Sequence, residues 1–228
     1  MRKNDLDSSV GAISKTGKRR KSSRDEKSQA LRKALFDAAV KVVGTFGYAK
    51  SKISAVADEA NVAQGTFYNY FESREALFDE LLPALGEELL NYISAQTADA
   101  ENFADREIKS FRAFFSFLKI RPEFYRILYE AEVFAPEAYQ RHMDRVANGY
   151  VRTLKRAAAH GELREADTES LEALSYILMG ARHYLCMRYA RAENEMLDLP
   201  DWVLNVYVDR VVNGIYIRPR ADGEKPAS

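Results

Sequence analysis

Apolar residues recur at three- and four-residue steps through most of the chain, which is the spacing of one face of an α-helix. The first strong stripe consists of Leu31, Ala34, Leu35, Ala38, Val42 and Phe46. Ser23 and Glu26 have the spacing of a capping box, so we predict that this helix begins at Ser23. Gly47 follows the stripe and offers a left-handed C-terminal stop. No alternating strand pattern competes, and the sequence predicts an all-α fold.

Residues 51–71 show a different pattern, which predicts two short helices separated by a tight turn. The residues expected to face inward are Ile53, Val56, Ala57, Ala60, Val62 and Phe67. Ala57 and Ala60 are small enough for two helices to cross closely, and Asn61 stands where the turn needs a positive φ. The pattern is typical of a helix-turn-helix whose second helix covers residues 64–71.

Longer helical patterns follow this unit and predict a larger helical body. Ser73 can cap a connecting helix, and Pro83 is expected to bend it. Further helices are expected at about residues 103–119, 122–132, 136–160, 168–192 and 200–216. We therefore predict a disordered basic arm over residues 1–22, a three-helix helix-turn-helix domain over residues 23–72 and the body over residues 73–228.

Basic and acidic residues are unevenly distributed, although the formal charge of the chain is zero at pH 7. The chain has 34 basic and 34 acidic residues. The first 72 positions contain 14 basic and 8 acidic residues, and the remaining positions contain 20 basic and 26 acidic residues. A basic head is suited to a polyanion such as nucleic acid. Its cations are densest between Lys15 and Lys27. This arm either contacts DNA phosphates or is a solvated tail, and the pattern alone leaves both interpretations open.

The composition also limits the classes of protein to be considered. Cys186 is the only cysteine, so neither an intrachain disulfide nor a metal site with several thiolates can form. We predict no metal and no cofactor, and a reducing cytoplasm fits a single thiol. The N-terminus is polar and basic, and no apolar run approaches the roughly 18 residues of a membrane-spanning helix. We therefore expect neither export nor a membrane partner.

One segment carries a dense motif, which starts at Gly47-Tyr48 and ends at Arg74-Glu75-Ala76-Leu77. Between these ends lie Ser51, Ile53, Val56, Ala57, Val62 and the run Gly65-Thr66-Phe67-Tyr68-Asn69-Tyr70-Phe71. The motif resembles the N-terminal motif of the TetR/AcrR family of transcriptional regulators. The resemblance implies a DNA-binding domain followed by a helical ligand-binding and dimerisation domain. It also implies a homodimer on a palindromic double-stranded DNA operator, most simply a repressor that a small apolar or amphipathic effector releases.

The second short helix has the chemistry of a DNA-reading helix independently of the family name. It is polar and has little bulk at its start, so it can enter a major groove. The resemblance extends the expected DNA-binding set to Lys52, Ser54, Gln64, Gly65, Thr66, Tyr68, Asn69, Tyr70 and Arg74. By resemblance, Thr66 and Tyr68 would mainly hold phosphates. Gln64 and Asn69 would lie nearer the base edges, which carry the sequence information.

Three positions depart from the pattern that the family usually shows, which is Gly, Ser and Lys where this chain has Asn61, Ala63 and Gln64. Ala63 lacks a capping hydroxyl worth about 1 kcal/mol. Gln64 removes a phosphate-binding charge, and this change either sharpens base reading or weakens affinity. Phe67 and Phe71 are expected to face inward and support the polar residues between them.

Aromatic residues concentrate in the body, which suits a cavity for an apolar or amphipathic ligand. The candidate ligand contacts are Phe111, Phe115, Arg126, Tyr129, His142, Tyr150 and His183, and ordinary core or surface duty is the alternative for each. The last two predicted helices offer much apolar surface, and a glycine inside a helix suggests close packing by another helix. The candidate dimer contacts are Leu178, Gly180, Trp202 and Val206, and an intramolecular core is the alternative.

An α-helical enzyme is the main rival interpretation, with Cys186–His183 or Glu130–His142 as catalytic pairs. Neither pair is accompanied by an orienting third group, an oxyanion donor loop or a glycine-rich phosphate loop. We therefore predict that the protein is not an enzyme. A helical adaptor that uses its head for protein contacts is a second rival. Salt-sensitive binding to a specific promoter would distinguish a regulator from both.

Overall fold

The computed structural model describes residues 13–163, 167–192 and 195–215, with side chains from Arg24 to Gly214 within these ranges. Over these residues the regular structure is helical, and the β-type pairing is a single bridge between Arg191 and Met196. The helices are α1 (Ile13–Phe46), α2 (Ile53–Glu59), α3 (Gln64–Phe67), α4 (Arg74–Gln96), α5 (Phe103–Ile120), α6 (Glu123–Phe134), α7 (Pro136–Ala159), α8 (Thr168–Leu185), α9 (Asp201–Tyr207) and α10 (Asn213–Ile215). The all-α prediction is confirmed.

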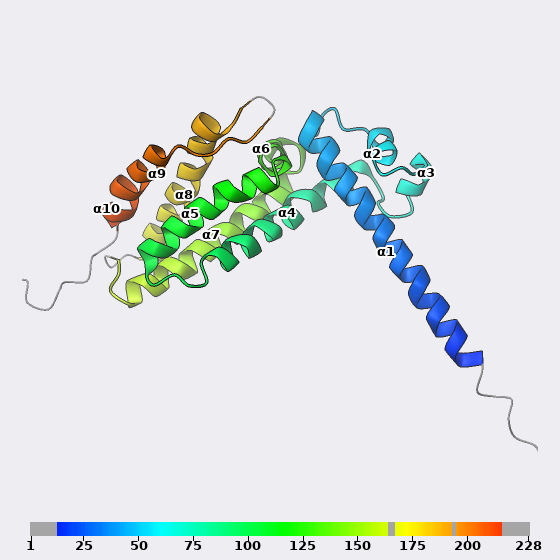
Figure 1. Cartoon of the computed structure of the whole chain (residues 1–228), viewed down its shortest axis with the longest axis horizontal. Helices are drawn as coiled ribbons and strands as arrows, with labels where there is room; N and C mark the ends of the chain where they lie inside the picture. Colours follow the sequence, from blue (N-terminus) through cyan, green and yellow to red (C-terminus); the bar gives the residue numbers. More distant parts are fainter. Residues whose placement is uncertain (1–12, 164–166, 193–194, 216–228) are drawn as a thin grey trace, which may run out of the picture.

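The helices form a small head and a larger body, which Figure 1 shows side by side. The head consists of α1, α2 and α3, and α4 runs from the head into the body. In the body, α4, α5, α7 and α8 pack along one another, α9 lies at the outer side, and α6 meets the C-terminal end of α1. None of the described helices combines the length and the apolar character needed to cross a bilayer.

The turns of the head form where the sequence predicts them. Gly47 ends α1 with a φ of 79°, and Asn61, between α2 and α3, has a φ of 54°. Ser73 caps α4, because its hydroxyl accepts a hydrogen bond from the amide of Ala76 at 3.0 Å. Pro83 lies inside α4, which continues past it to Gln96. The predicted positions of the turn residues and of the α4 cap are therefore confirmed.

Three helix limits differ from the prediction. Helix α1 begins at Ile13, so the boundary at Ser23 is wrong, and ten residues of the predicted arm belong to the helix. The first ten residues of α1 have no apolar period, so periodicity does not detect them. They are rich in Lys and Arg, which have high helix propensity. Residues 1–12 and the side chain of Ser23 lie outside the described residues.

The second short helix is also shorter than expected, because α3 ends at Phe67 and the chain continues to Tyr70 as a turn. Backbone bonds from Asn69 to Thr66 and from Tyr70 to Phe67 hold this turn. In the body, α8 gives way to π-helical geometry over Cys186–Ala190.

The end of α1 is fixed to α6 through backbone groups at the Gly47 turn. The carboxylate of Glu130 accepts a hydrogen bond from the amide of Tyr48 at 2.8 Å. The guanidinium of Arg126 donates to the carbonyl of Thr45, which belongs to the last turn of α1. Carbonyls in a last helical turn and amides beyond it have no partner within the helix, so these side chains satisfy groups that would otherwise need water. Helix α6 thereby carries the contact between body and head.

An aromatic cluster surrounds the same turn. The ring of Tyr48 is fully buried, with its centroid 4.8 Å from that of Phe78 on α4 and 6.0 Å from that of Phe134 on α6. Aromatic pairs in such arrangements add to the stabilisation from buried area. The turn is therefore held by both helices that lead from the head into the body.

The first prediction concerns this turn. Replacing Gly47 with Ala should lower the free energy of unfolding by about 1–3 kcal/mol, because a side chain is strained at positive φ. The added Cβ would also lie 2.6 Å from a carboxylate oxygen of Glu130. The control is Gly180→Ala in α8, where the Cβ meets nothing within 4 Å. This variant should be neutral or more stable by up to about 1 kcal/mol. Urea unfolding followed by circular dichroism measures the free energy of unfolding of both variants. An equal change in the two variants would contradict this view of the turn.

Candidate functional site

The surface formed by the start of α2 and by α3 presents the polar residues singled out in the sequence. Phe67 and Phe71 are buried beneath it, as predicted, and they hold the intervening residues outward. Tyr68 is 53% exposed. The other exposed members of the set are Lys52, Ser54, Gln64, Gly65 and Asn69, and the half-buried ones are Thr66, Tyr70 and Arg74. The arrangement offers hydroxyl, amide and ammonium groups to a partner.

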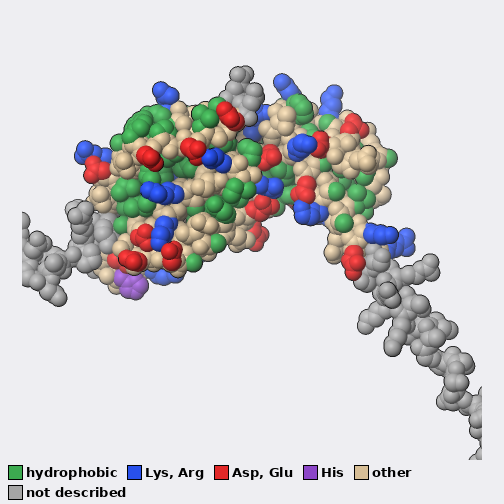
Figure 2. Space-filling model, viewed as in Figure 1, with side chains coloured by type: hydrophobic (Ala, Val, Ile, Leu, Met, Phe, Trp, Pro, Cys, Tyr) green, Lys and Arg blue, Asp and Glu red, His purple; other side chains and the backbone are tan. Residues whose placement is uncertain are grey.

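Local features keep this surface open and positively charged. Ala63 occupies the cap position of α3 without a side-chain hydrogen bond, as expected for a residue with no hydroxyl. A Cβ added at Gly65 would meet nothing within 4 Å, so a partner's backbone can approach closely there. Lys50 and Lys52 are exposed and form no ion pair with another described residue. Figure 2 shows Lys and Arg side chains projecting from the head.

Arg74 takes a different position from the other members of the set. Its guanidinium forms an ion pair with Glu75 at 3.0 Å and donates to the carbonyl of Ser51 at 3.4 Å. It also lies over the ring of Phe78, 5.4 Å from the centroid. In this arrangement Arg74 ties the start of α4 to the loop before α2, and a DNA contact by it stays a prediction.

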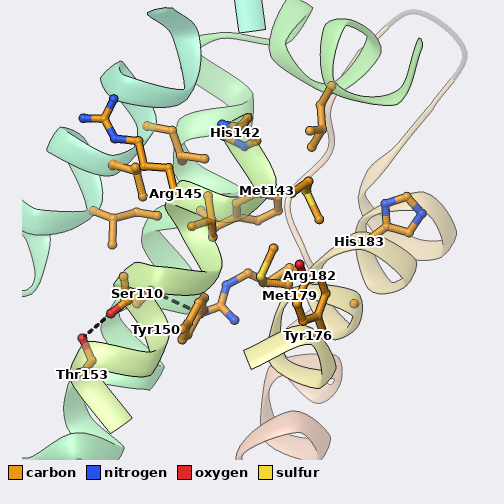
Figure 3. A pocket seen from close by; sticks show the side chains of 18 of the residues that line it. Ser110, His142, Met143, Arg145, Tyr150, Thr153, Tyr176, Met179, Arg182 and His183 are labelled. Atoms are coloured by element: carbon orange, nitrogen blue, oxygen red, sulfur yellow. Dashed lines mark hydrogen bonds between the residues drawn. The ribbon is translucent and has the colours of Figure 1, made fainter. Parts of the chain in front are cut away.

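A cavity of about 720 Å³ lies in the body between helices α4, α5, α6, α7 and α8 (Figure 3). Of the candidate ligand contacts, Tyr129, His142, Tyr150 and His183 line it. Apolar side chains supply much of the remaining wall, among them Leu89, Ile93, Phe114, Leu128, Met143 and Met179. Several lining residues are exposed, including Arg145, Arg152 and Tyr176, so the cavity reaches the surface.

Three of the candidate ligand contacts lie elsewhere. Phe111 is buried in the core, stacked on Tyr207 with ring centroids 4.0 Å apart. Phe115 is also buried, with its ring 5.3 Å from that of Phe114. Arg126 faces the head and bonds to α1. Sequence composition identifies these side chains as aromatic or polar, but the rotation of each helix decides which of them meets the cavity.

One end of the cavity contains polar residues that the sequence analysis missed. Ser110 of α5, Thr153 of α7 and Arg182 of α8 line it beside Tyr150, as Figure 3 shows. Arg182 is buried and forms an ion pair with Glu107 at 2.8 Å. The sequence does contain a signal for the buried position of Arg182, because this residue continues the apolar stripe of its helix four residues after Leu178. A charge at such a position is buried with a partner or is bent out to solvent.

Two histidines lie on other parts of the wall. His142 of α7 packs against Gly86 of α4, where any added Cβ would collide with the imidazole ring. Burial, and to a lesser extent the charge of Arg145, lowers the pKa of His142 to about 4. His183 stacks on Tyr129 and one of its ring nitrogens lies 2.7 Å from the phenolic oxygen. Burial also lowers the pKa of His183. At neutral pH the two imidazoles therefore add hydrogen-bonding groups rather than charge to the wall.

The rival catalytic pairs gain no support from their surroundings. Cys186 is fully buried, and burial raises the pKa of its thiol to about 12, so the nucleophilic thiolate is suppressed. Glu130 is occupied by the amide of Tyr48. Among the described residues, no group of His, Cys, Asp and Glu side chains could hold a metal ion.

The candidate dimer contacts separate into two pairs. Leu178 is fully buried within the protomer, which agrees with the alternative of an intramolecular core. Gly180 lines the cavity and has open space beside it within the protomer, so a dimer contact there stays a prediction. Trp202 and Val206 of α9 are 55% and 54% exposed. Helix α8 also carries exposed apolar side chains, namely Tyr176, Ile177 and Tyr184. Figure 2 shows hydrophobic surface over the end of the body that carries α9.

The fold and the α2–α3 surface define a helix-turn-helix protein with a helical body, and comparisons with known proteins agree. Residues 35–81 match the family model for bacterial regulatory proteins of the tetR family. An uncharacterized HTH-type transcriptional regulator of Bacillus subtilis (strain 168), YhgD, is 40% identical over 58 residues, which are 25% of this chain and 30% of that protein. The fatty acid metabolism regulator protein of the same organism is 35% identical over 75 residues, covering 33% and 37%.

The likeness extends over the body at the level of the fold. The transcriptional regulator FadR from Bacillus subtilis, solved in complex with stearoyl-CoA, superposes with a TM-score of 0.61. The superposition covers 78% of this chain and 98% of that chain at 20% identity. The curated relatives are matched over only about a third of their length. Residues 35–81 therefore match the tetR family, and the body shares its fold with this solved regulator.

The second prediction follows from the lowered pKa of His142. The imidazole binds a proton near pH 6.5 in the unfolded chain but only near pH 4 in the folded one, so stability is lost as pH falls through this interval. Replacing His142 with Asn should remove up to about 3 kcal/mol of that loss between pH 7 and pH 4.

Urea unfolding at a series of pH values measures the slope for each protein. The matched control is His160→Asn, which removes an exposed histidine from the end of α7. If both substitutions changed the slope equally, burial of His142 would not be the cause.

Proposed function

We propose that the protein is a ligand-responsive transcriptional repressor that binds a palindromic DNA operator as a homodimer. A small apolar or amphipathic effector, bound in the body, releases it from the operator. The observation that carries the proposal is the exposed polar surface of α3, held outward by the buried Phe67 and Phe71 within the segment that matches the family. Because the protein would bind operator DNA, we also propose that it acts in the cytoplasm.

The roles of the α3 residues follow from the groups that they expose. Thr66 and Tyr68 offer hydroxyls suited to phosphates, while Gln64 and Asn69 offer amides that can pair with base edges. Lys52, Ser54 and Tyr70 flank them. The short length of α3 does not oppose this proposal, because recognition helices contact bases mainly through their N-terminal residues.

A homodimer would use the apolar surface of α8 and α9. Exposed large apolar residues are ordinary when they are scattered, but a contiguous group marks an interaction surface. We infer that Trp202 and Val206 of α9 form such a group together with the exposed side chains of α8, which are Tyr176, Ile177 and Tyr184. Each protomer carries one recognition helix, and two half-sites about one helical turn or more apart need two protomers.

The effector proposal rests on the cavity. Its volume of about 720 Å³ lies within the usual range for small-molecule sites, about 300–1,000 Å³. Its wall is largely apolar with a polar end, which suits an amphipathic molecule. The structural neighbour from Bacillus subtilis, whose bound ligand is stearoyl-CoA, supports the same class.

Two helices could carry the response from the cavity to the head. Leu89 of α4 and Tyr129 of α6 line the cavity, and both helices hold the turn at Tyr48. A ligand shifts an equilibrium only by its difference in affinity for the two states. A molecule that fills the cavity in one position of α6 but not in another would therefore move the end of α1.

The third prediction tests the DNA surface. A duplex is first selected from random or genomic fragments with the full-length protein. Thr66→Ala and Tyr68→Ala should then weaken binding to all duplexes, because phosphate contacts carry no sequence information. Gln64→Ala and Asn69→Ala should also change the preferred base at one or two positions per half-site, by about 1–3 kcal/mol.

Asn91→Ala is the matched control, since Asn91 is exposed on α4 and lies outside this surface. It should leave affinity and base preference unchanged. Uniform loss in all four α3 variants would refute the assigned roles, and failure to select any duplex would refute the regulator proposal itself.

The fourth prediction tests the dimer. Val206→Asp should give a monomer with much weaker operator binding, because a charge is placed in an apolar interface. Val133→Asp is the control, since Val133 is 74% exposed on α6. Sedimentation velocity at matched protein concentrations measures the assembly. A dimer in the Val206 variant, or a monomer in both variants, would contradict the proposed interface.

A further inference from the structure

The polar end of the cavity combines groups from three helices. Ser110 of α5, Tyr150 of α7 and Arg182 of α8 converge there, and Thr153 lies one turn after Tyr150 (Figure 3). The hydroxyl of Ser110 accepts a hydrogen bond from the Arg182 guanidinium at 3.2 Å. Tyr176 and Met179 of α8 line the cavity beside Arg182. A ligand that enters the cavity with an apolar body would bring one of its ends against these groups.

The charge of Arg182 is already neutralised by a partner within the protein. The Glu107 carboxylate lies 2.8 Å from the guanidinium, and the side chains of both residues are almost fully buried. Tyr207 of α9 donates a hydrogen bond to the same carboxylate oxygen at 2.5 Å. Burial lowers the pKa of Arg182, but Glu107, Tyr150 and Tyr207 together outweigh this effect, and the pKa is raised. The cavity end therefore contains a complete ion pair with no net charge.

The donors of Arg182 are also largely occupied. One terminal nitrogen donates to the carbonyl of Leu178 at 3.0 Å, and the other donates to Glu107 and Ser110. A carboxylate placed here would compete with Glu107 for the guanidinium and would leave an uncompensated negative charge away from water. Burial of an unpaired charge is far more costly than burial of a hydrogen-bonded polar group.

Uncharged groups meet the opposite situation. Burial raises the pKa of Tyr150, so its hydroxyl remains a neutral donor, and Ser110 and Thr153 add hydroxyls that can donate or accept. A carbonyl, an ester or an alcohol can exchange hydrogen bonds with these hydroxyls without adding charge. The remaining ionised groups of the wall lie at more exposed positions, namely Arg106, Glu132, Arg145, Arg152 and Arg156. An anionic part of a ligand would find its partners among those residues instead.

We propose that the end of the cavity around Ser110, Tyr150 and Arg182 binds an uncharged hydrogen-bonding group of an otherwise apolar effector, and that Glu107 excludes a carboxylate from it. The effector group that binds at this end is then an ester, thioester, ketone or alcohol rather than a carboxylate. This inference rests on the proposed effector cavity and adds the rule by which it selects its ligand.

The experiment compares two probes with the same chain, methyl decanoate and decanoate, by calorimetric titration of the dimer at pH 7.5. The wild-type protein should bind the ester at least about tenfold more tightly. Glu107→Gln keeps the shape of the side chain and leaves Arg182 uncompensated. In this variant the preference should move toward decanoate by at least about tenfold. The matched control is Glu132→Gln, which removes a carboxylate from the exposed part of the same wall and should leave the preference unchanged.

A second variant is needed in case Glu107→Gln does not fold, because that substitution leaves the buried guanidinium of Arg182 without its partner. Replacing Glu107 with Gln and Arg182 with Met together removes both charges, and this double variant should still prefer the ester. A shift toward decanoate in the double variant, an equal shift in Glu132→Gln, or tighter decanoate binding by the wild type would overturn the selection rule while leaving the effector cavity intact. If neither probe bound the wild-type protein, the proposed effector cavity would itself be overturned.

Discussion

The relative position of head and body depends on one constraint, the docking of the end of α1 on α6. The left-handed turn at Gly47 ends the helix and directs the amide of Tyr48 toward the Glu130 carboxylate. The same carboxylate occupies the space that a side chain at position 47 would need. Arg126 holds the last turn of α1 from the same helix. Because α6 also lines the cavity, the residues that fix the head belong to the element that a ligand would touch.

The cavity and the α3 surface accordingly belong to one mechanical unit. Helix α4 begins with Arg74 against the loop before α2, passes Phe78 at the Tyr48 ring, and reaches the cavity at Leu89. It crosses α7 closely at Gly86, where the buried ring of His142 leaves no room for a side chain. Packed interfaces of this kind repack between discrete arrangements rather than deforming continuously. In the proposed dimer, a small displacement at the cavity would therefore change the separation of the two α3 surfaces.

Sequence patterns predicted the parts of this architecture that have a local chemical cause. The turn at Gly47 and the positive φ of Asn61 could be predicted because few residues tolerate that conformation. For the cavity, the sequence predicted that a ligand site would exist in the body but not which residues would line it. Phe111 and Tyr150 are equally aromatic in the sequence, and only the packing of helices places one in the core and the other at the cavity. Arg182 was missed because its role depends on a carboxylate 75 positions away in the chain.

The most direct test of the account is reciprocal linkage between operator and effector. Operator affinity is measured with and without saturating methyl decanoate, and methyl decanoate affinity with and without saturating operator, at matched salt and protein concentrations. The account predicts that each ligand weakens the other by the same factor, about 5- to 150-fold, or about 1–3 kcal/mol of coupling. Binding of methyl decanoate with unchanged operator affinity would contradict it, because the cavity would then not be coupled to the head.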